Sequence, residues 1–329
     1  MSRPEVVLLQ MGGPARLGEL RPFYQRLFGD PDLIQLPAAI RPAQPTLARI
    51  MALVRGRSMR QRYAQIGGGS PLLAHTTGLA HAVERELATR GEPTSVHIAM
   101  RYSEPSATAV VADLQARGVE QVVLFPLYPH WSRSTAGSSV ADFRRAAGAR
   151  GYRGRIDLVP AWGSDPRYIN LLISQIEATR AQLAEASDGS IHLLLSAHGL
   201  PVRYVQRGDP YPTQVRETAA SVAAQVSGFA GWHLGFQSRM GPVRWLGPST
   251  DLVLADIAAL DATGIVAVPL GFVSDHIETL YDLDILYRGQ ALALGIAHYR
   301  RVPTFNAHPT FASIVADLVS QTTVEVAAA

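Results

Sequence analysis

The sequence predicts an α/β fold with two similar halves. Short apolar runs alternate along its 329 residues with longer stretches of helical periodicity, as expected when strands and helices follow one another with right-handed crossovers. Several of the short runs are β-branched and continuously apolar, which is typical of buried parallel strands. Three or four of these runs lie on each side of residue 160, so we expect two halves joined by a crossover at Asp157–Asp165.

Seven short apolar runs are predicted to be strands. They are, in chain order, Val6–Met11, Val96–Met100, Gln121–Phe125, Ile156–Val159, Ile191–Ser196, His233–Phe236 and Ile265–Pro269. Apolar residues at helical spacing predict helices over residues 72–87 and 168–178, and Pro309–Leu318 is predicted to be a final helix with proline in its first turn. The stretch Leu36–Arg62 holds three prolines and then five arginines. We expect it to be a long irregular segment, either a binding loop or a solvated basic surface.

The composition excludes several classes of protein. Hydrophobic residues make up 47% of the chain and charged residues 17%, a balance that fills a core and excludes a disordered chain. A formal net charge of +3 is too small to indicate nucleic acid binding, but it suits an acidic small molecule or an anionic membrane surface. Because the chain has no cysteine, disulfides, thiolate metal sites and cysteine-ligated clusters are excluded.

No segment of the sequence predicts export or membrane spanning. The apolar run Val6–Leu9 is too short for the core of a signal peptide, and no stretch approaches the length of a bilayer span. We therefore expect a cytoplasmic protein that is at most peripheral, at the inner face of the membrane, and that has no C-terminal anchor.

Two glycine-rich turns adjoin predicted elements. Gln10–Pro14 follows the first strand and Gly67–Pro71 precedes a helix, so either could present backbone N–H groups to an anion. Neither contains the dinucleotide-binding pattern or a Walker lysine, which disfavours a nucleotide-dependent enzyme. An ordinary turn is the commoner explanation of each.

A histidine stands where a predicted strand ends. In the stretch Leu193–Pro201 an apolar run leads to His198, which glycine and proline follow closely. Ligands of open parallel sheets bind at the carboxyl ends of the strands, so His198 is a candidate proton acceptor or metal ligand. The alternative is a structural histidine at the edge of the core.

Acidic residues follow the strand Ile265–Pro269. Glu278 and Asp282 are four residues apart, so on an α-helix both carboxylates share one face, where they could pass on a divalent cation or exchange protons. A solvated acidic helix face is the alternative for this pair. Asp275, at the start of the same helix, is expected to cap it.

Aromatic and polar residues also follow predicted strands. Together they could line a slot for a flat aromatic ligand, with arginines that bind acidic groups on its rim. Each aromatic residue alone is explained as well by ordinary core packing. The stretches are Arg101–Tyr102, Tyr128–Ser132, Gln237–Arg239 and Trp245–Pro248.

Eight stretches, in order, resemble the ferrochelatase family, and the likeness runs nearly end to end. They are Gln10–Pro14, Tyr63–Leu72, Met100–Pro105, Phe125–Ser139, Ser196–Pro201, Gly208–Tyr211, Gln237–Pro248 and Gly271–Tyr281. The resemblance implies two Rossmann-like halves, each a four-stranded parallel sheet flanked by helices, with a porphyrin held in the cleft between them. It implies a first domain of residues 1–158 completed by residues 305–329, and a second domain of residues 159–304.

The resemblance also implies roles for individual residues. His198 matches the family's active-site histidine and Glu278 its essential carboxylate, so both are implied as catalytic groups and as metal ligands, with Asp282 as a weak third ligand. Many relatives carry a further acidic residue where this chain has Leu286, so a long carboxylate track to the surface is not expected. The residues implied to line the porphyrin pocket are Met11, Arg55, Tyr63, Ser70, Arg101, Tyr102 and Trp245.

The function implied is insertion of Fe²⁺ into protoporphyrin IX, a lyase reaction of haem biosynthesis that forms protohaem and releases two protons. Met11 and the apolar stretch Leu33–Ile40 favour protoporphyrin IX over coproporphyrin III, which some bacterial members use. The partners implied are a porphyrin and ferrous iron, both as substrates. No permanently bound cofactor, iron–sulfur cluster or nucleic acid is expected, and a monomer is favoured.

Two rival functions fit parts of the sequence. A chelatase for another metal or tetrapyrrole is disfavoured by the stretch Ser274–Tyr281. A porphyrin or haem carrier would need the cleft but not the acidic pair. The presence of both His198 and Glu278 therefore favours an enzyme.

Overall fold

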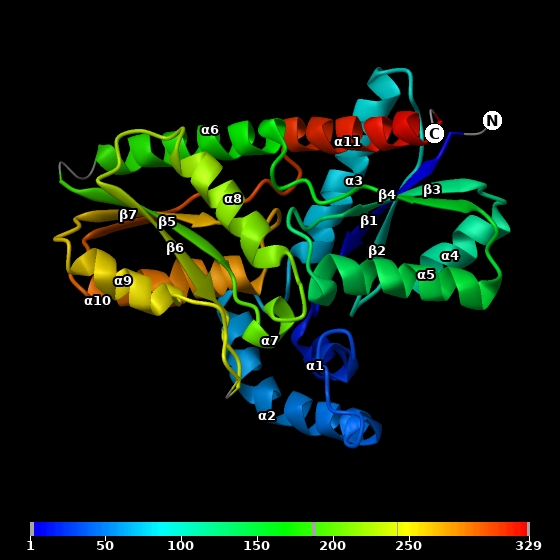
Figure 1. Ribbon diagram of the computed structural model, residues 1–329, viewed down its shortest axis with the longest axis horizontal. Helices are drawn as coiled ribbons and strands as arrows, with labels where there is room; N and C mark the ends of the chain where they lie inside the picture. The colour runs from blue at the N-terminus through cyan, green and yellow to red at the C-terminus, as the bar shows by residue number, and fades with distance from the viewer. Residues whose placement is uncertain (1–2, 186–188, 242, 328–329) are drawn as a thin grey trace. The chain divides into compact units, whose positions relative to one another are not determined.

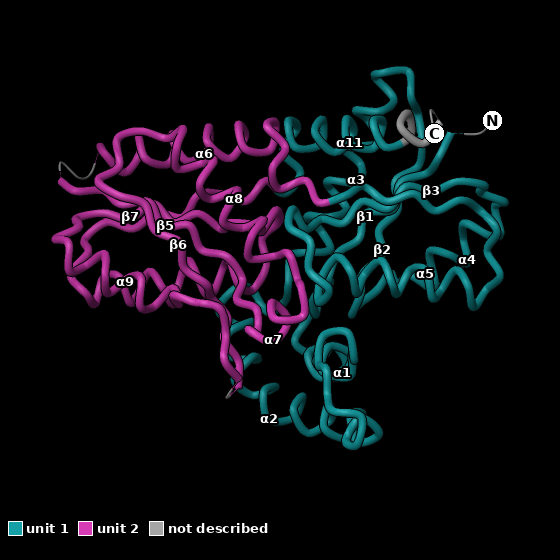
Figure 2. Tube along the Cα trace, viewed as in Figure 1, with its two compact units in different colours: residues 1–160, 306–329 teal, residues 161–305 magenta. Residues whose placement is uncertain are grey.

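The computed structural model describes residues 3–185, 189–241 and 243–327. The chain forms two compact units, Met1–Pro160 with Asn306–Ala329 and Ala161–Phe305 (Figure 2). The family resemblance places the corresponding boundaries after residues 158 and 304. Each unit has its own parallel sheet and its own core.

The first unit is built on a four-stranded parallel sheet in the order β2-β1-β3-β4 (Figure 1). Helices α4 and α5 pack on one face, where Val7 and Leu9 of the central strand meet Val111 and Phe143. Helices α3 and α11 lie against the other face. The strands are β1 (Glu5–Gln10), β2 (Val96–Met100), β3 (Gln121–Pro126) and β4 (Arg155–Leu158). The helices are α1 (Leu20–Gly29), α2 (Gln44–Gln65), α3 (Leu72–Thr89), α4 (Ala107–Ala116), α5 (Ser138–Arg150) and α11 (Pro309–Ala327), with the short 3₁₀-helices η1 (Leu17–Glu19) and η2 (Arg41–Ala43) and the π-helical turn η3 (Arg133–Gly137).

The second unit repeats this design with the strand order β6-β5-β7-β8, again all parallel. Helices α6 and α8 cover one face of the sheet, and α9 and α10 cover the other (Figure 1). The strands are β5 (Ile191–His198), β6 (Gly231–Gln237), β7 (Gly264–Pro269) and β8 (His298–Arg301). The helices are α6 (Pro166–Ala184), α7 (Val202–Val205), α8 (Tyr211–Ala223), α9 (Thr250–Ala258), η4 (Glu278–Tyr287) and α10 (Arg288–Ala293).

The predicted fold class is confirmed, because each unit is a four-stranded parallel sheet flanked by helices. The two sheets also have the same strand order when the strands are counted along the chain. All seven predicted strands are present, and their ends either match or differ by one or two residues. Strand β8 was not predicted. Its sequence, His298–Arg301, ends in two arginines and lacks the apolar run typical of a buried parallel strand.

The prediction of an irregular segment over Leu36–Arg62 is wrong, because most of this stretch belongs to the 22-residue helix α2. Two of its three prolines, Pro42 and Pro45, lie in the first turns of η2 and α2, where the missing N–H has no partner to lose. The buried face of α2 includes the small residues Ala48 and Ala52, whereas Leu53 and Val54 are exposed. The apolar periodicity that identifies an ordinary amphipathic helix is therefore absent.

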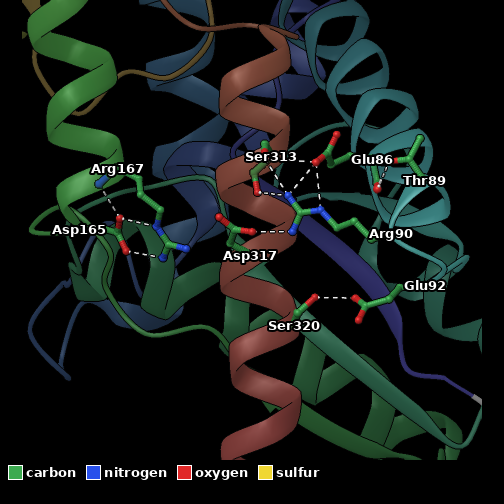
Figure 3. A network of polar contacts seen from close by, with 9 residues as sticks. All are labelled: Glu86, Thr89, Arg90, Glu92, Asp165, Arg167, Ser313, Asp317 and Ser320. Carbon is green, nitrogen blue, oxygen red and sulfur yellow. Dashed lines mark hydrogen bonds and ion pairs between the residues drawn. The ribbon is translucent and has the colours of Figure 1, made fainter.

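The C-terminal helix α11 is fastened to α3 by polar contacts as well as by its buried apolar residues (Figure 3). Arg90, just beyond α3, bonds to Glu86 in the preceding turn and to Asp317 and Ser313 on α11. Ser320 donates to Glu92 at 2.8 Å. These contacts explain why the end of the chain completes the first unit. Among the described helices, none is both long and apolar enough to cross a membrane.

Candidate active site

Three neighbouring strands of the second unit end at the edge that carries the candidate groups. His198 is the last residue of β5, as predicted, and Gln237 is the last residue of β6. Gly199, the residue after His198, donates its N–H to the Gln237 carbonyl at 2.8 Å. A Cβ on Gly199 would lie only 2.7 Å from that carbonyl oxygen, so the close turn after His198 requires glycine.

His198 and Glu278 form a hydrogen-bonded pair, although 80 residues separate them in the chain. The distance from His198 Nδ1 to Glu278 Oε2 is 3.0 Å, and the two side chains are 40% and 22% exposed. Tyr211 fixes the backbone at this point, because its hydroxyl donates to the His198 carbonyl at 2.9 Å. Strand pairing explains the meeting, since β5 lies next to β7 and Glu278 follows β7 along the chain.

The pair favours the charged form of both partners. Desolvation alone would lower the pKa of His198, but the charge and hydrogen bond of Glu278, helped by the charge of Asp282, raise it above the usual value. Desolvation alone would raise the pKa of Glu278, but the His198 charge and hydrogen bond lower it. An ionised carboxylate beside a histidine with increased proton affinity is an arrangement suited to proton transfer.

A second histidine, His276, lies beside this pair. Its Nε2 is 3.9 Å from Glu278 Oε2, and its ring centroid is 5.0 Å from that of Phe272. Its Nδ1 is buried and has no hydrogen-bond partner among the described residues. Desolvation is the main cause of a lowered pKa for His276, so this ring favours the neutral form. The sequence analysis assigned no role to His276, and the signal that could have found it is its position between Asp275 and Glu278, shortly after a buried strand.

Glu278 and Asp282 lie in a π-helical segment, η4, and not in the α-helix that their spacing was taken to indicate. Such helices bond residue i to i+5, are rare, and occur often at functional sites. The prediction that Asp275 caps the helix is wrong: the N-cap is Ile277, and Asp275 accepts from the Thr279 side chain instead. Asp282 is buried and accepts from Ser238 Oγ at 3.4 Å. Within the described residues, no three His, Asp or Glu side chains form a ready metal-binding cluster.

Four of the predicted pocket residues meet at the carboxyl ends of β1 and β2 in the first unit. Tyr102 donates its N–H to the Met11 carbonyl at 3.0 Å, and Arg101 follows β2 directly. Ser70 donates its N–H to the carbonyl of Pro14, in the turn after β1, at 2.7 Å. The family resemblance assigned these four residues to one pocket, and the structure brings them to one edge of the first sheet.

Arg101 and Tyr102 belong to a buried polar network around Asp30. The Tyr102 hydroxyl donates to Asp30 Oδ2 at 2.6 Å, and the Tyr102 residue is only 1% exposed. Arg101 pairs with Asp30 at 2.9 Å and with Asp142 at 3.3 Å, and its Nε donates to Ser138. Burial is the main reason that the pKa of Tyr102 is raised well above its usual value, and the Asp30 charge adds to the effect. In this structure both side chains support the strand end from within.

The remaining predicted pocket residues belong to other elements. Arg55 and Tyr63 are both on α2, where Arg55 is partly exposed and Tyr63 is buried. Trp245 lies in the second unit, and its Nε1 donates to the Met240 carbonyl at 3.0 Å. The Trp245 ring lies 3.4 Å from the position that a Cβ on Gly199 would occupy, which puts it near the turn after His198.

Comparisons with known proteins agree with the fold and the motifs. The ferrochelatase family model matches residues 4–323. A ferrochelatase of Geotalea uraniireducens is 39% identical over 96% of this chain and 97% of its own length. A ferrochelatase of Synechococcus elongatus is 39% identical over 98% of this chain and 83% of its own. A solved multi-domain protein of Deinococcus radiodurans, described as structurally similar to chelatases, aligns with a TM-score of 0.51 and 14% identity over 98% of this chain and 56% of its own.

Proposed function

Because this chain belongs to the ferrochelatase family, we propose that it inserts Fe²⁺ into protoporphyrin IX to form protohaem and release two protons. Membership makes the protein a metal chelatase, a lyase that acts on a porphyrin and a metal ion. The observation that carries the proposal is the 3.0 Å pair of His198 and Glu278, with His276 beside it. Insertion needs a base for pyrrole protons and an oxygen ligand for iron that has lost water, and this cluster offers both.

The directions of the pKa shifts support a division of roles within the pair. In its neutral form His198 can accept a pyrrole proton, and the neighbouring Glu278 carboxylate, which raises the pKa of His198, stabilises the imidazolium that results. The lowered pKa of Glu278 keeps its carboxylate ionised and available to the incoming cation. In this proposal His198 takes protons from the macrocycle while Glu278 guides the metal, and Asp282 contributes weakly behind it.

In the first unit, the porphyrin is proposed to contact Met11, Ser70, Arg101 and Tyr102, with Arg55 and Tyr63 contributing from α2. In the second unit, it is proposed to contact Trp245. A pocket that bends the macrocycle exposes its nitrogen lone pairs and so resembles the transition state more than the flat substrate does. Met11, directly after β1, offers an apolar contact that suits protoporphyrin IX better than the tetracarboxylate coproporphyrin III. Coproporphyrin III is the alternative substrate. Iron is a substrate here, and we propose no permanently bound cofactor and no iron–sulfur cluster.

We further propose peripheral contact with an anionic membrane through α2. Residues 33–83 contain six arginines and no acidic residue, so the charge of this stretch is entirely positive. Ile50, Leu53 and Val54 of α2 are 52%, 54% and 74% exposed. Exposed apolar side chains beside several arginines offer an anionic lipid surface both an apolar contact and a favourable charge. We propose that the protein is cytoplasmic and monomeric.

Anaerobic turnover tests the proposed reaction. Ferrous iron is supplied with protoporphyrin IX or, separately, with coproporphyrin III, and loss of porphyrin fluorescence is followed. Preferential turnover of protoporphyrin IX is the expected result. Preference for coproporphyrin III would overturn the substrate, and tight binding of either porphyrin without insertion would favour a carrier.

A further inference from the structure

Arg301, the last residue of β8, joins two carboxylates on either side of Glu278. Its Nε and Nη2 donate to the two oxygens of Asp284 at 2.8 and 2.9 Å, which is a two-point contact. Its Nη1 lies 3.1 Å from Asp275 Oδ1. The Arg301 side chain is only 11% exposed, so these contacts are largely shielded from water. One guanidinium therefore ties the loop before Glu278 to the π-helical segment after it.

Thr279, the residue after Glu278, connects Asp275 to the backbone next to Glu278 through hydrogen bonds. Asp275 Oδ1, which faces Arg301, also accepts the Thr279 hydroxyl at 2.9 Å. The same hydroxyl oxygen accepts the His276 N–H at 3.0 Å, and Thr279 is completely buried. The residues on both sides of Glu278 are thus held by a chain of contacts that begins at Arg301.

We propose that Arg301 is a positioning residue for the site: it holds Asp275 and Asp284 so that Glu278 stays within hydrogen-bond distance of His198. Continuous π-helix is rare, and η4 runs for ten residues, so its geometry needs support from outside the segment. Asp284 lies within η4 and Asp275 just before it, so Arg301 supports the segment at two points. This inference rests on the proposed chelatase chemistry of His198 and Glu278.

A simple stabilising role predicts a different result from a positioning role. If Arg301 only stabilised the second unit, its loss would lower porphyrin affinity, turnover and thermal stability together. If it positions Glu278, the porphyrin still binds, but the carboxylate is misplaced. A displacement of about 1 Å can cost on the order of 100-fold in rate.

The test compares Arg301→Met, Arg301→Lys and the control Arg300→Met. Methionine keeps part of the apolar stem and removes the charged fork, while lysine keeps the charge but not the two-point contact. Arg300 is the neighbouring exposed residue of β8, and its guanidinium contacts Gln182 at 3.1 Å, away from the site. The measurements are Tm, porphyrin affinity by fluorescence quenching, and kcat and KM for ferrous iron under anaerobic conditions.

We expect Arg301→Met to lower kcat about 100-fold while porphyrin affinity stays within about threefold, Arg301→Lys to fall between it and the wild type, and Arg300→Met to match the wild type. Unchanged kcat in Arg301→Met would overturn the proposal. So would parallel losses of kcat and porphyrin affinity in both Arg301 variants, because these indicate general destabilisation.

A readout that needs no turnover separates this inference from the proposed function. In the wild type, the His198 Nδ1–H that donates to Glu278 is expected to give a strongly downfield proton NMR signal at fixed pH. The signal is expected to disappear or move upfield in Arg301→Met and to persist in Arg300→Met. If the wild-type protein inserts no metal, the proposed function fails, and this signal still decides whether Arg301 positions Glu278.

Discussion

Lowering the pH from 7 to 5 is expected to destabilise the protein through His130, which follows β3 in the first unit. His130 is only 2% exposed, and burial lowers its pKa from 6.5 to about 4. As the pH falls below 6.5, the unfolded chain takes up a proton that the folded chain does not, so stability decreases until the pH approaches 4. Between pH 7 and 5 this difference costs about 2 kcal/mol of unfolding free energy.

Urea denaturation of the wild type, His130→Gln and His81→Gln at pH 7, 6 and 5 tests this reasoning. Glutamine does not titrate, so the unfolding free energy of His130→Gln is expected to fall by about 2 kcal/mol less than that of the wild type over this range. His81 is exposed on α3, and His81→Gln is the matched control for replacing a histidine by glutamine. The comparison is between slopes, so any difference in stability at pH 7 does not affect it. Equal slopes for His130→Gln and the wild type would refute the argument.

Three further perturbations test the site and its surroundings. Glu278→Gln is expected to reduce anaerobic turnover at least about 100-fold and to lower the pKa of His198, measured by NMR titration, because it removes the charge that raises it. Asp30→Ala is expected to lower the unfolding free energy by about 3–5 kcal/mol in urea, because it leaves Arg101 buried without its main partner; a loss below 1 kcal/mol would contradict this. Leu53→Asp on α2 is expected to weaken sedimentation with anionic vesicles while turnover in detergent stays unchanged, and equal sedimentation would count against the membrane contact.

Much of the fold followed from local pattern, because parallel strands buried on both faces leave apolar runs in the sequence. The failures have a physical cause as well. Strand β8 carries Arg300 and Arg301, since an edge strand can keep polar side chains. Helix α2 buries small residues such as Ala48 and exposes Leu53, so it lacks the apolar stripe of an ordinary amphipathic helix.

The candidate site was predictable as separate strand ends, but its geometry was not. His198 was found because it ends one apolar run, and Glu278 was found because it follows a second apolar run. Their distance of 3.0 Å depends on the pairing of β5 with β7, which brings the two strand ends to one edge. No local pattern gives strand order, so the meeting of the two groups had to come from family resemblance or from the structure.

The residues that hold the site in place are harder to predict from the sequence than its reacting groups are. Arg301 belongs to a strand that the sequence did not predict, and it acts on Glu278 through Asp275 and Asp284. Its role depends on the π-helical geometry of η4, and the spacing of Glu278 and Asp282 gave no sign of that geometry because the same spacing fits an α-helix. Groups that touch substrate are concentrated at strand ends, where sequence analysis looks for them. Groups that hold them in place are set by tertiary contacts, and for this protein those contacts make β8 part of the site.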